Sequence, residues 1–203
     1  MVGSAPKDDT VENRQGQGIV SPLHLKVIYG QDPLSLTLPA SPDITLKRHD
    51  PVNEEAGKRP IKILFVCLAN LCRSPIAKVI AKTFYGGIIE AESAGIAPAK
   101  EPVFPETVFI LKKFYGVDIS GHKSRRVLEF PLADFDYIIA MDSSIFIRLS
   151  EIKAVPKDKL YSWDVKDPSG LGIEAYEWTA LQIEDNLDRF FRKHRARTKN
   201  KKI

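Results

Sequence analysis

The chain has 203 residues and a net charge of +4, and its hydrophobic content of 43% suits one folded domain with an appendage. No apolar stretch approaches the length of a membrane span and the N-terminal segment has no apolar core, so we expect neither a transmembrane helix nor a secretory signal. Two cysteines are too few for a disulfide scaffold, which favours a reducing, cytoplasmic location.

The segment before Ile61 differs in composition from the rest of the chain. Residues 1–20 are polar and rich in Gly and Gln, so we expect a disordered tail there. Residues 21–50 contain two alternating apolar stretches around the turn sequence "GQDP", which predicts a β-hairpin. Such a hairpin is marginally stable alone and would need to dock on another surface. Residues 51–60 are predicted to form a linker.

From Ile61 onward, short apolar strands alternate with helical segments. "IKILFVC" is predicted to be a buried strand, followed by a helix with Ser74 as N-cap and Pro75 as its first residue. Strands are further predicted over 88–95, 134–142 and 157–163, and helices over 105–116, 143–150 and 175–195. This alternation predicts a doubly wound α/β fold over residues 61–195, with a four-stranded parallel sheet between two layers of helices.

The loop "VCLANLCRSP" holds both cysteines of the chain, Cys67 and Cys72. It follows a predicted strand and precedes a helix, whose free N–H groups and dipole can bind an anion such as phosphate. Arg73 adds a planar fork of donors that can hold two phosphate oxygens. The same positive field favours the thiolate of Cys67, which could attack phosphorus and form a phosphocysteine. The loop amides and Arg73 would then stabilise the transition state.

Dephosphorylation also needs an acid that protonates the leaving oxygen. Asp167 lies in "VKDPSG" after the fourth predicted strand, and the following proline fixes the loop at the same edge of the sheet. Each feature has an ordinary alternative, since a lone cysteine is often a small buried hydrophobe and Asp-Pro is a common turn pair. Their combination with Arg73 favours a phosphate-cleaving site.

The stretch "ILFVCLANLCRSPIA" resembles the signature of the low-molecular-weight protein-tyrosine phosphatases. The segments "ESAGI", "ISGHKSRR", "DFDYIIAMD" and the Asp-Pro loop follow in the order of that family, so the resemblance covers about residues 61–195. It implies hydrolysis of phosphomonoesters, chiefly phosphotyrosine in proteins, through a phosphocysteine. It also implies that the reaction needs neither a metal nor an organic cofactor.

The resemblance implies a role for individual residues. Cys67 is the nucleophile, Arg73 the phosphate clamp, and Asp167 the general acid and later the base that activates water. Cys72 matches a second cysteine that can form a disulfide with Cys67 and so protect an oxidised nucleophile. The phosphate-binding loop comprises Leu68, Ala69, Asn70, Leu71, Cys72 and Ser74, and Ser93 and His122 belong with Asn70 and Ser74 to the hydrogen-bond network that shapes it.

Several positions depart from the pattern of that family. Ala69 stands where a glycine is usual, and Ile145 stands where asparagine is common. Ser169 and Gly170 follow the Asp-Pro pair where many relatives have tyrosines that wall the substrate. The segment after "SAG" also lacks a frequent aromatic residue.

Three alternatives remain open. Arsenate reductases of this fold use further redox cysteines, and none follows Cys72. A threonine before the second loop cysteine marks the arginine phosphatases, whereas this chain has Leu71. The third alternative is a phosphoprotein-binding or scaffolding module with weak turnover.

Basic residues gather at the C-terminus. Residues 189–203 carry eight Lys or Arg and no acid, so residues 1–188 have a net charge of −4. The tail over 196–203 could contact acidic partners, although a solvated helix end is the simpler interpretation, and we expect no nucleic acid partner.

Overall fold

The structure is a computed structural model that describes residues 11–12, 18–19 and 59–200, and within the last range the side chains of 193–200 are not described. Strands β1 (Val11–Glu12) and β2 (Gly18–Ile19) form a short antiparallel pair within the segment predicted to be a disordered tail. The predicted hairpin over 21–50 and nearly all of the predicted linker lie outside the described residues. So do residues 201–203 of the predicted basic tail.

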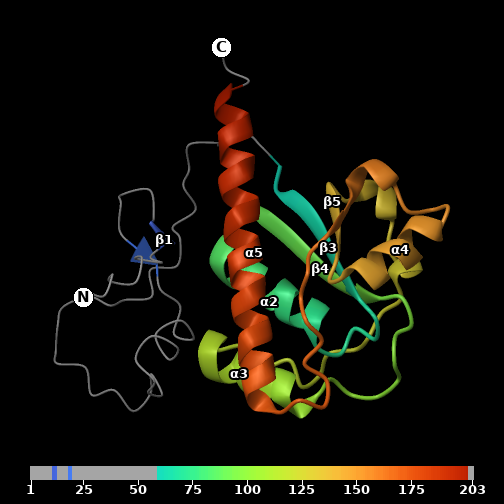
Figure 1. The fold of residues 1–203 in the computed structure, drawn as a ribbon, viewed down its shortest axis with the longest axis vertical. Helices are drawn as coiled ribbons and strands as arrows, with labels where there is room; N and C mark the ends of the chain where they lie inside the picture. Colours follow the sequence, from blue (N-terminus) through green and yellow to red (C-terminus); the bar gives the residue numbers. More distant parts are fainter. Residues whose placement is uncertain (1–10, 13–17, 20–58, 201–203) are drawn as a thin grey trace, which may run out of the picture. The chain divides into compact units, whose positions relative to one another are not determined.

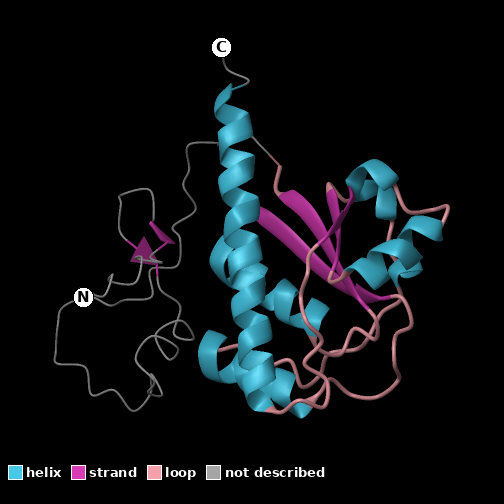
Figure 2. Ribbon diagram, viewed as in Figure 1, coloured by secondary structure: helices cyan, strands magenta, loops and turns pink. Residues whose placement is uncertain are grey.

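The remaining elements alternate between strands and helices, as predicted. They are β3 (Ile61–Cys67), α2 (Arg73–Tyr85), β4 (Ile89–Gly95), α3 (Pro105–Tyr115), β5 (Tyr137–Ala140), α4 (Ser143–Glu151), β6 (Leu160–Ser162) and α5 (Ile173–Asn200), with short 3-10 helices η2 (Val127–Glu129), η3 (Leu132–Asp134) and η4 (Lys157–Lys159). Figure 2 shows the strands of the sheet lying between helices. The predicted four-stranded parallel α/β sheet is confirmed.

The strand order places the carboxyl end of β3 at the centre of one sheet edge. The order is β4-β3-β5-β6, and every neighbouring pair is parallel. The chain first adds β4 on one side of β3 and then returns to add β5 on the other side, with Cys67 aligned to Gly95 and Val66 to Ala140. Such a reversal opens a crevice at the carboxyl edge of a parallel sheet, where ligands bind.

The sheet is buried on both faces because helices cover each of them (Figure 1). Successive strand residues point to opposite faces. Leu64 and Val66 of β3 therefore share one core with Ile145 and Leu149 of α4. Ile63 alternates with Leu64 and is equally buried. On the side of the sheet away from α4, α2 packs against both β4 and α5.

Some predicted boundaries shift in the structure. The first helix begins at Arg73 rather than Ser74, and its N-cap is Cys72, which makes no capping hydrogen bond. The prediction of Ser74 as N-cap was wrong, because its hydroxyl turns inward to Cys67 and Asn70 instead. The predicted strand over 134–142 shortens to β5, and its first residue, Asp134, belongs instead to the 3-10 helix Leu132–Asp134. Likewise, η4 replaces the first half of the strand predicted over 157–163.

The final helix is longer than predicted. α5 runs from Ile173 to Asn200 and buries Ile183, Leu187 and Phe191 against the domain. Tyr85 of α2 stacks on Phe191 with ring centroids 4.1 Å apart, which fixes α5 against α2. Within the part of the chain that the structure describes, no helix combines the length and the apolar character needed to cross a membrane.

Candidate active site

The loop from Leu68 to Cys72 connects β3 to α2 at the crevice predicted by the strand order. Within the described residues, the backbone N–H groups of Leu68, Ala69, Leu71 and Cys72 donate no hydrogen bond. No side chain caps α2 either, so the loop presents unpartnered backbone donors beside a helix N-terminus. Such an arrangement binds anions.

Cys67 ends β3 and lies at the base of this loop, with 1% of its surface exposed. Its Sγ accepts a hydrogen bond from the backbone N–H of Asn70 at 3.2 Å and lies 3.1 Å from Ser74 Oγ. Ser74 Oγ in turn accepts from Asn70 Nδ2 at 2.9 Å and donates to the carbonyl oxygen of Ala94 at 3.1 Å. The sulfur therefore lies within hydrogen-bond reach of one backbone N–H group and one hydroxyl group at the base of the loop.

Asn70 shapes the loop through both its backbone and its side chain. Its φ of 61° is the only left-handed non-glycine conformation among the described residues, and asparagine tolerates it because its short amide can hydrogen-bond locally. Asn70 Oδ1 accepts from the backbone N–H of Arg125 at 3.0 Å, and His122 Nε2 lies 3.0 Å from the Asn70 carbonyl oxygen. Burial lowers the pKa of His122, so the neutral ring with its proton on Nε2 donates to Asn70.

Gly95 allows the loop to pack against the end of β4. A Cβ at this position would lie 2.7 Å from the carbonyl oxygen of Leu68 and 3.1 Å from the backbone nitrogen of Asn70. The next residues hold the loop from the same side, since Ile96 N donates to Cys67 O at 3.1 Å and Ala97 N donates to Leu68 O at 3.0 Å. The sequence "ESAGI" therefore supports the loop directly from the neighbouring strand.

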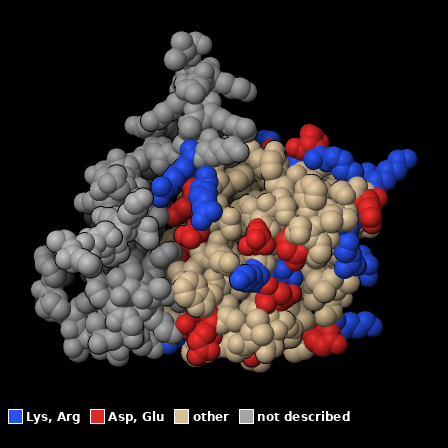
Figure 3. Space-filling model, viewed as in Figure 1, with Lys and Arg blue, Asp and Glu red and all other residues tan. Residues whose placement is uncertain are grey.

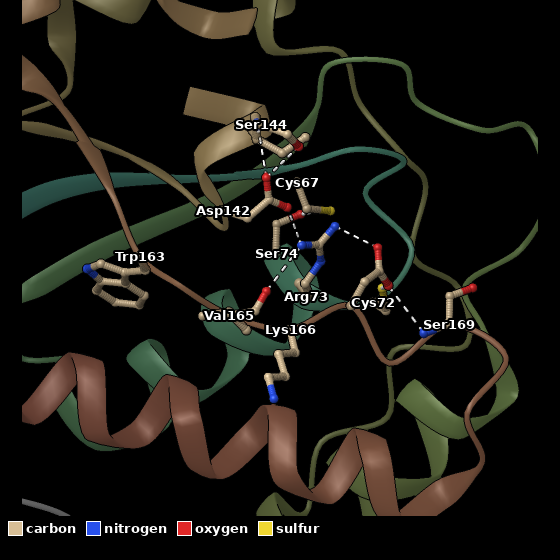
Figure 4. A network of polar contacts seen from close by, with 12 residues as sticks. Cys67, Cys72, Arg73, Ser74, Asp142, Ser144, Trp163, Val165, Lys166 and Ser169 are labelled. Carbon is tan, nitrogen blue, oxygen red and sulfur yellow. Dashed lines mark hydrogen bonds and ion pairs between the residues drawn. The ribbon is translucent and has the colours of Figure 1, made fainter. Parts of the chain in front are cut away.

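Arg73 lies at the centre of the site, and Figure 4 shows its guanidinium between Asp142 and the chain around Val165. Its Nη1 donates to Asp142 Oδ2 at 2.5 Å and to the carbonyl oxygen of Val165 at 3.2 Å, and its Nη2 donates to Asp167 Oδ2 at 2.6 Å. Burial opposes the charge of this side chain, but Asp142 and Asp167 outweigh it and raise the pKa of Arg73. Its buried Nε has no partner among the described residues.

Asp142 is a site residue that the sequence reasoning did not select. It follows β5 and caps α4 by accepting from Ile145 N at 2.9 Å, while Ser144 Oγ donates to the same oxygen at 2.6 Å. Burial raises the pKa of Asp142, but these hydrogen bonds and Arg73 outweigh burial and hold the pKa below its usual value. The position of Asp142 directly after a strand, at the carboxyl edge of the sheet, could have identified it as a site residue. An aspartate at this position is also explained by helix capping alone, so the position by itself does not indicate a site.

Asp167 reaches Arg73 from the loop after β6. Its side chain is 44% exposed, and its Oδ1 accepts from Ser169 N at 3.2 Å. The Sγ of Cys72 lies 3.9 Å from the same oxygen, and burial raises the pKa of Cys72 to about 12, so it remains a thiol. Neither Cys67 nor Cys72 is in a disulfide in this structure. The carboxylate thus lies at the mouth of the loop, between the arginine and solvent.

Ser93 departs from its predicted role. It lies buried in β4 beside Phe65 of β3, and its Oγ makes no hydrogen bond with any described residue. Ser74 instead uses the carbonyl oxygen of the next β4 residue, Ala94. The structure therefore does not bring Ser93 into the hydrogen-bond network around Cys67, although it brings Asn70, Ser74 and His122 together there.

A cavity of about 310 Å³ opens beside Arg73 and is lined by Leu68, Asp142, Val165 and Asp167 among others. Of the loop side chains, Leu68 is 41% exposed at its rim, whereas Leu71 is buried and holds the loop through its carbonyl oxygen, which accepts from Thr107 Oγ1 at 3.2 Å. Basic and acidic side chains lie intermixed on the face shown in Figure 3. Among residues 59–192, no cluster of His, Cys, Asp and Glu has the makeup of a metal site.

Comparison with known proteins places this geometry in one family. A family model described as low molecular weight phosphotyrosine protein phosphatase matches residues 62–202. The low molecular weight protein-tyrosine-phosphatase YfkJ of Bacillus subtilis is 46% identical over 90 residues, covering 41% of this chain and 57% of YfkJ. A crystal structure of a low molecular weight protein tyrosine phosphatase from T. tengcongensis superposes with a TM-score of 0.60 and 35% identity, covering 66% of this chain and 99% of that one.

Two relatives with other named activities match over a longer part of the chain. The glutaredoxin arsenate reductase of Synechocystis sp. is 28% identical over 132 residues, covering 65% of this chain and 97% of the relative. The protein-arginine-phosphatase of Geobacillus stearothermophilus is 27% identical over 143 residues, covering 66% of this chain and 96% of the relative. The matched region is thus similar to proteins whose names give different activities.

Proposed function

This chain belongs to the low molecular weight phosphotyrosine protein phosphatase family, and we propose that it hydrolyses phosphotyrosine in proteins through a phosphocysteine on Cys67. The observation that carries the proposal is the convergence of three groups at one loop. The Sγ of Cys67 accepts from the loop amide of Asn70, and Arg73 at the end of the same loop holds Asp167 at 2.6 Å. A nucleophile, an oxyanion clamp and a proton donor thus surround one anion site.

In the first step, the Cys67 thiolate attacks phosphorus while the bond from phosphorus to the leaving oxygen breaks. Asp167 in its protonated form gives its proton to that oxygen, so the alcohol leaves neutral. The loop amides and Arg73 bind the equatorial phosphate oxygens, where negative charge is concentrated in the transition state. The unpartnered Arg73 Nε supports this assignment, because a buried donor without a partner is unfavourable until a ligand accepts from it.

In the second step, water attacks the phosphocysteine and the bond from phosphorus to sulfur breaks. Asp167, now a carboxylate, takes a proton from that water, and Cys67 leaves as a thiolate. Ser74 Oγ lies 3.1 Å from the sulfur, and its one proton, which goes to the Ala94 carbonyl oxygen in this structure, can turn to the sulfur and stabilise this leaving group. Inorganic phosphate then departs, and Arg73 can return to its contact with Asp167.

The remaining residues of the site shape it rather than react. Asn70 and His122 hold the loop, and the backbone groups of Leu68, Ala69, Leu71 and Cys72 face the phosphate. Cys72 is proposed to form a reversible disulfide with Cys67 after oxidation, which would protect the nucleophile from further oxidation. Because Cys67 must be reduced to react, we also propose a reducing cytoplasmic location.

The substrate class needs a direct test, because relatives of this chain include a protein-arginine-phosphatase and an arsenate reductase. Leu71 stands where arginine phosphatases have a threonine, and the chain has no cysteine beyond Cys67 and Cys72 for a longer thiol relay. These features favour the tyrosine branch. The basic residues after Arg189 are proposed only as a contact for acidic regions of a partner protein.

We expect phosphotyrosine peptides to be hydrolysed with a kcat/KM at least about 10²-fold above phosphoserine and phosphoarginine peptides of the same sequence. The proposed nucleophile, Cys67, is 1% exposed at the base of the loop, and a long planar phenol reaches that base better than the short serine side chain. Phosphate release from the three peptides at several pH values checks this result. A preference for phosphoarginine would reassign the substrate, and Cys67-independent release would contradict the enzyme mechanism itself.

A further inference from the structure

The position of Asp167 depends on the two residues that precede it. Val165 extends the hydrogen bonding between β5 and β6 beyond the ends of both strands, since its N–H donates to the carbonyl oxygen of Met141 at 2.9 Å. Its own carbonyl oxygen accepts from Arg73 Nη1 at 3.2 Å. Both peptide groups of this buried residue are therefore occupied by the sheet and by the phosphate clamp.

The peptide groups of Lys166 are held instead by the final helix. Gln182 Oε1 accepts from the backbone N–H of Lys166 at 3.3 Å, and Thr179 Oγ1 donates to its carbonyl oxygen at 3.3 Å. Thr179 and Gln182 are three residues apart on α5, so they face the same side of the helix. The Lys166 side chain extends toward α5 and away from Arg73 in Figure 4, so its backbone rather than its charge lies at the site.

After Asp167, Pro168 is buried, but the hydrogen bonds of the following turn in the described part of the chain reach no other element. Ser169 N donates to Asp167 Oδ1 at 3.2 Å and Leu171 N donates to the carbonyl oxygen of Pro168 at 3.1 Å, and both contacts are local to the turn. Gly170 and Gly172 have φ values of 77° and 82°, which only a glycine-rich turn adopts readily. Arg73 and Ser169 N thus contact the Asp167 carboxylate itself, whereas the hydrogen bonds that tie its backbone to other elements lie on its N-terminal side.

We propose that Thr179 and Gln182 are positioning residues that hold the Asp167 carboxyl group over the leaving oxygen. This inference rests on the proposed function, in which Asp167 is the general acid. Neither residue touches the phosphate site, and both act through the backbone of Lys166. Thr179 is 1% exposed, and its hydroxyl donates to another segment rather than to the preceding turn of its own helix, the usual partner of a mid-helix threonine. Misplacing a reacting group by about 1 Å can reduce a rate roughly 10²-fold.

Leaving-group dependence separates positioning of an acid from a merely structural role. Proton donation matters most when the leaving group is a poor one, such as phenol with a pKa of about 10. It matters less for p-nitrophenol, which leaves readily without a proton. The measured quantity is the kcat/KM for p-nitrophenyl phosphate divided by that for phenyl phosphate. A partly unfolded variant loses both rates equally and leaves this ratio unchanged.

We expect the ratio to rise about tenfold in the double variant Thr179→Val with Gln182→Leu, and to rise further in Asp167→Asn, which removes the acid itself. Thr107→Val is the matched control, because it removes an equally buried hydroxyl that holds the phosphate loop at Leu71 instead. It should weaken inhibition by inorganic phosphate without changing the ratio. Thr179→Ser keeps the hydroxyl and should keep the wild-type ratio.

The outcomes distinguish the two claims. A raised ratio in Asp167→Asn with a wild-type ratio in the Thr179 and Gln182 variants would overturn the positioning role and leave the proposed function standing. An unchanged ratio in Asp167→Asn would overturn both, since no acid would then be in use. Where the apolar double variant does not fold, Gln182→Asn tests the same contact, because shortening the side chain by one methylene removes its reach to Lys166 N.

Discussion

Replacing Cys67 by serine is expected to reduce phosphatase turnover by roughly 10⁴-fold or more, the order seen when an enzyme nucleophile is removed. A serine hydroxyl is hardly ionised near neutral pH, and the donors around Cys67 Sγ can stabilise a thiolate but contain no base that could deprotonate an alcohol. The hydrolysis of p-nitrophenyl phosphate by the purified wild-type and variant proteins measures this loss.

Two controls show that such a loss reflects chemistry rather than unfolding. Cys72→Ser makes the same atomic change elsewhere in the loop, at a buried thiol with a raised pKa, and should retain measurable turnover. Cys67→Ser should still bind inorganic phosphate, seen as a rise of its melting temperature with phosphate concentration. Turnover in Cys67→Ser close to that of the wild type would exclude Cys67 as the nucleophile.

Arg73→Lys should lower kcat/KM by about 10³-fold and also destabilise the fold, although it preserves the charge. The guanidinium of Arg73 donates to two carboxylates and to the Val165 carbonyl oxygen at once, and its side chain is 5% exposed. A single ammonium group cannot reach Asp142, Asp167 and Val165 together. One buried acceptor is then left unpaired, at an expected loss of about 1–3 kcal/mol in the free energy of unfolding.

Steady-state kinetics with p-nitrophenyl phosphate, inhibition by inorganic phosphate and chemical denaturation measure the three effects of Arg73→Lys. The matched control is Arg189→Lys on the outer face of α5, where the arginine side chain is 77% exposed and contacts only Asp185 at 3.8 Å among the described ion pairs. That variant should match the wild type in activity and in stability within about 0.5 kcal/mol. Equal effects of both substitutions would show that Arg73 is not a specific phosphate clamp.

The fold was predictable because its signals are local. Buried parallel strands appear in the sequence as short apolar runs such as "IKILFVC", and helices appear as apolar periodicity bounded by Pro or Gly. The loop from Cys67 to Arg73 was predictable for a related reason, since its cysteine, arginine and helix start are close in sequence. The boundary errors around Leu132–Asp134 and Lys157–Lys159 arose where 3-10 turns replace strand, which composition does not distinguish.

Most contacts that complete the site were not predictable, because they join segments far apart in sequence. Asp167, 94 residues from Arg73, was predicted at the site from its place at the sheet edge, whereas Asp142, 69 residues from Arg73, was not. Thr179 and Gln182 lie in the middle of an amphipathic helix, where nothing in the residue pattern indicates a bond to Lys166. For Ser93 the error is the opposite one. The family resemblance predicted that Ser93 belongs to the hydrogen-bond network of the loop, but its Oγ has no hydrogen-bond partner among the described residues.

The most direct measurement of the central claim is to trap the covalent intermediate. Asp167→Asn slows hydrolysis of the intermediate because it removes the base that activates water. Rapid mixing of this variant with p-nitrophenyl phosphate, followed by quenching, digestion and mass spectrometry, should give a peptide that carries one phosphoryl group on Cys67. The same treatment of Cys67→Ser should give none. Phosphate release by the wild type without any phosphocysteine, or a phosphoryl group on another residue, would contradict the mechanism.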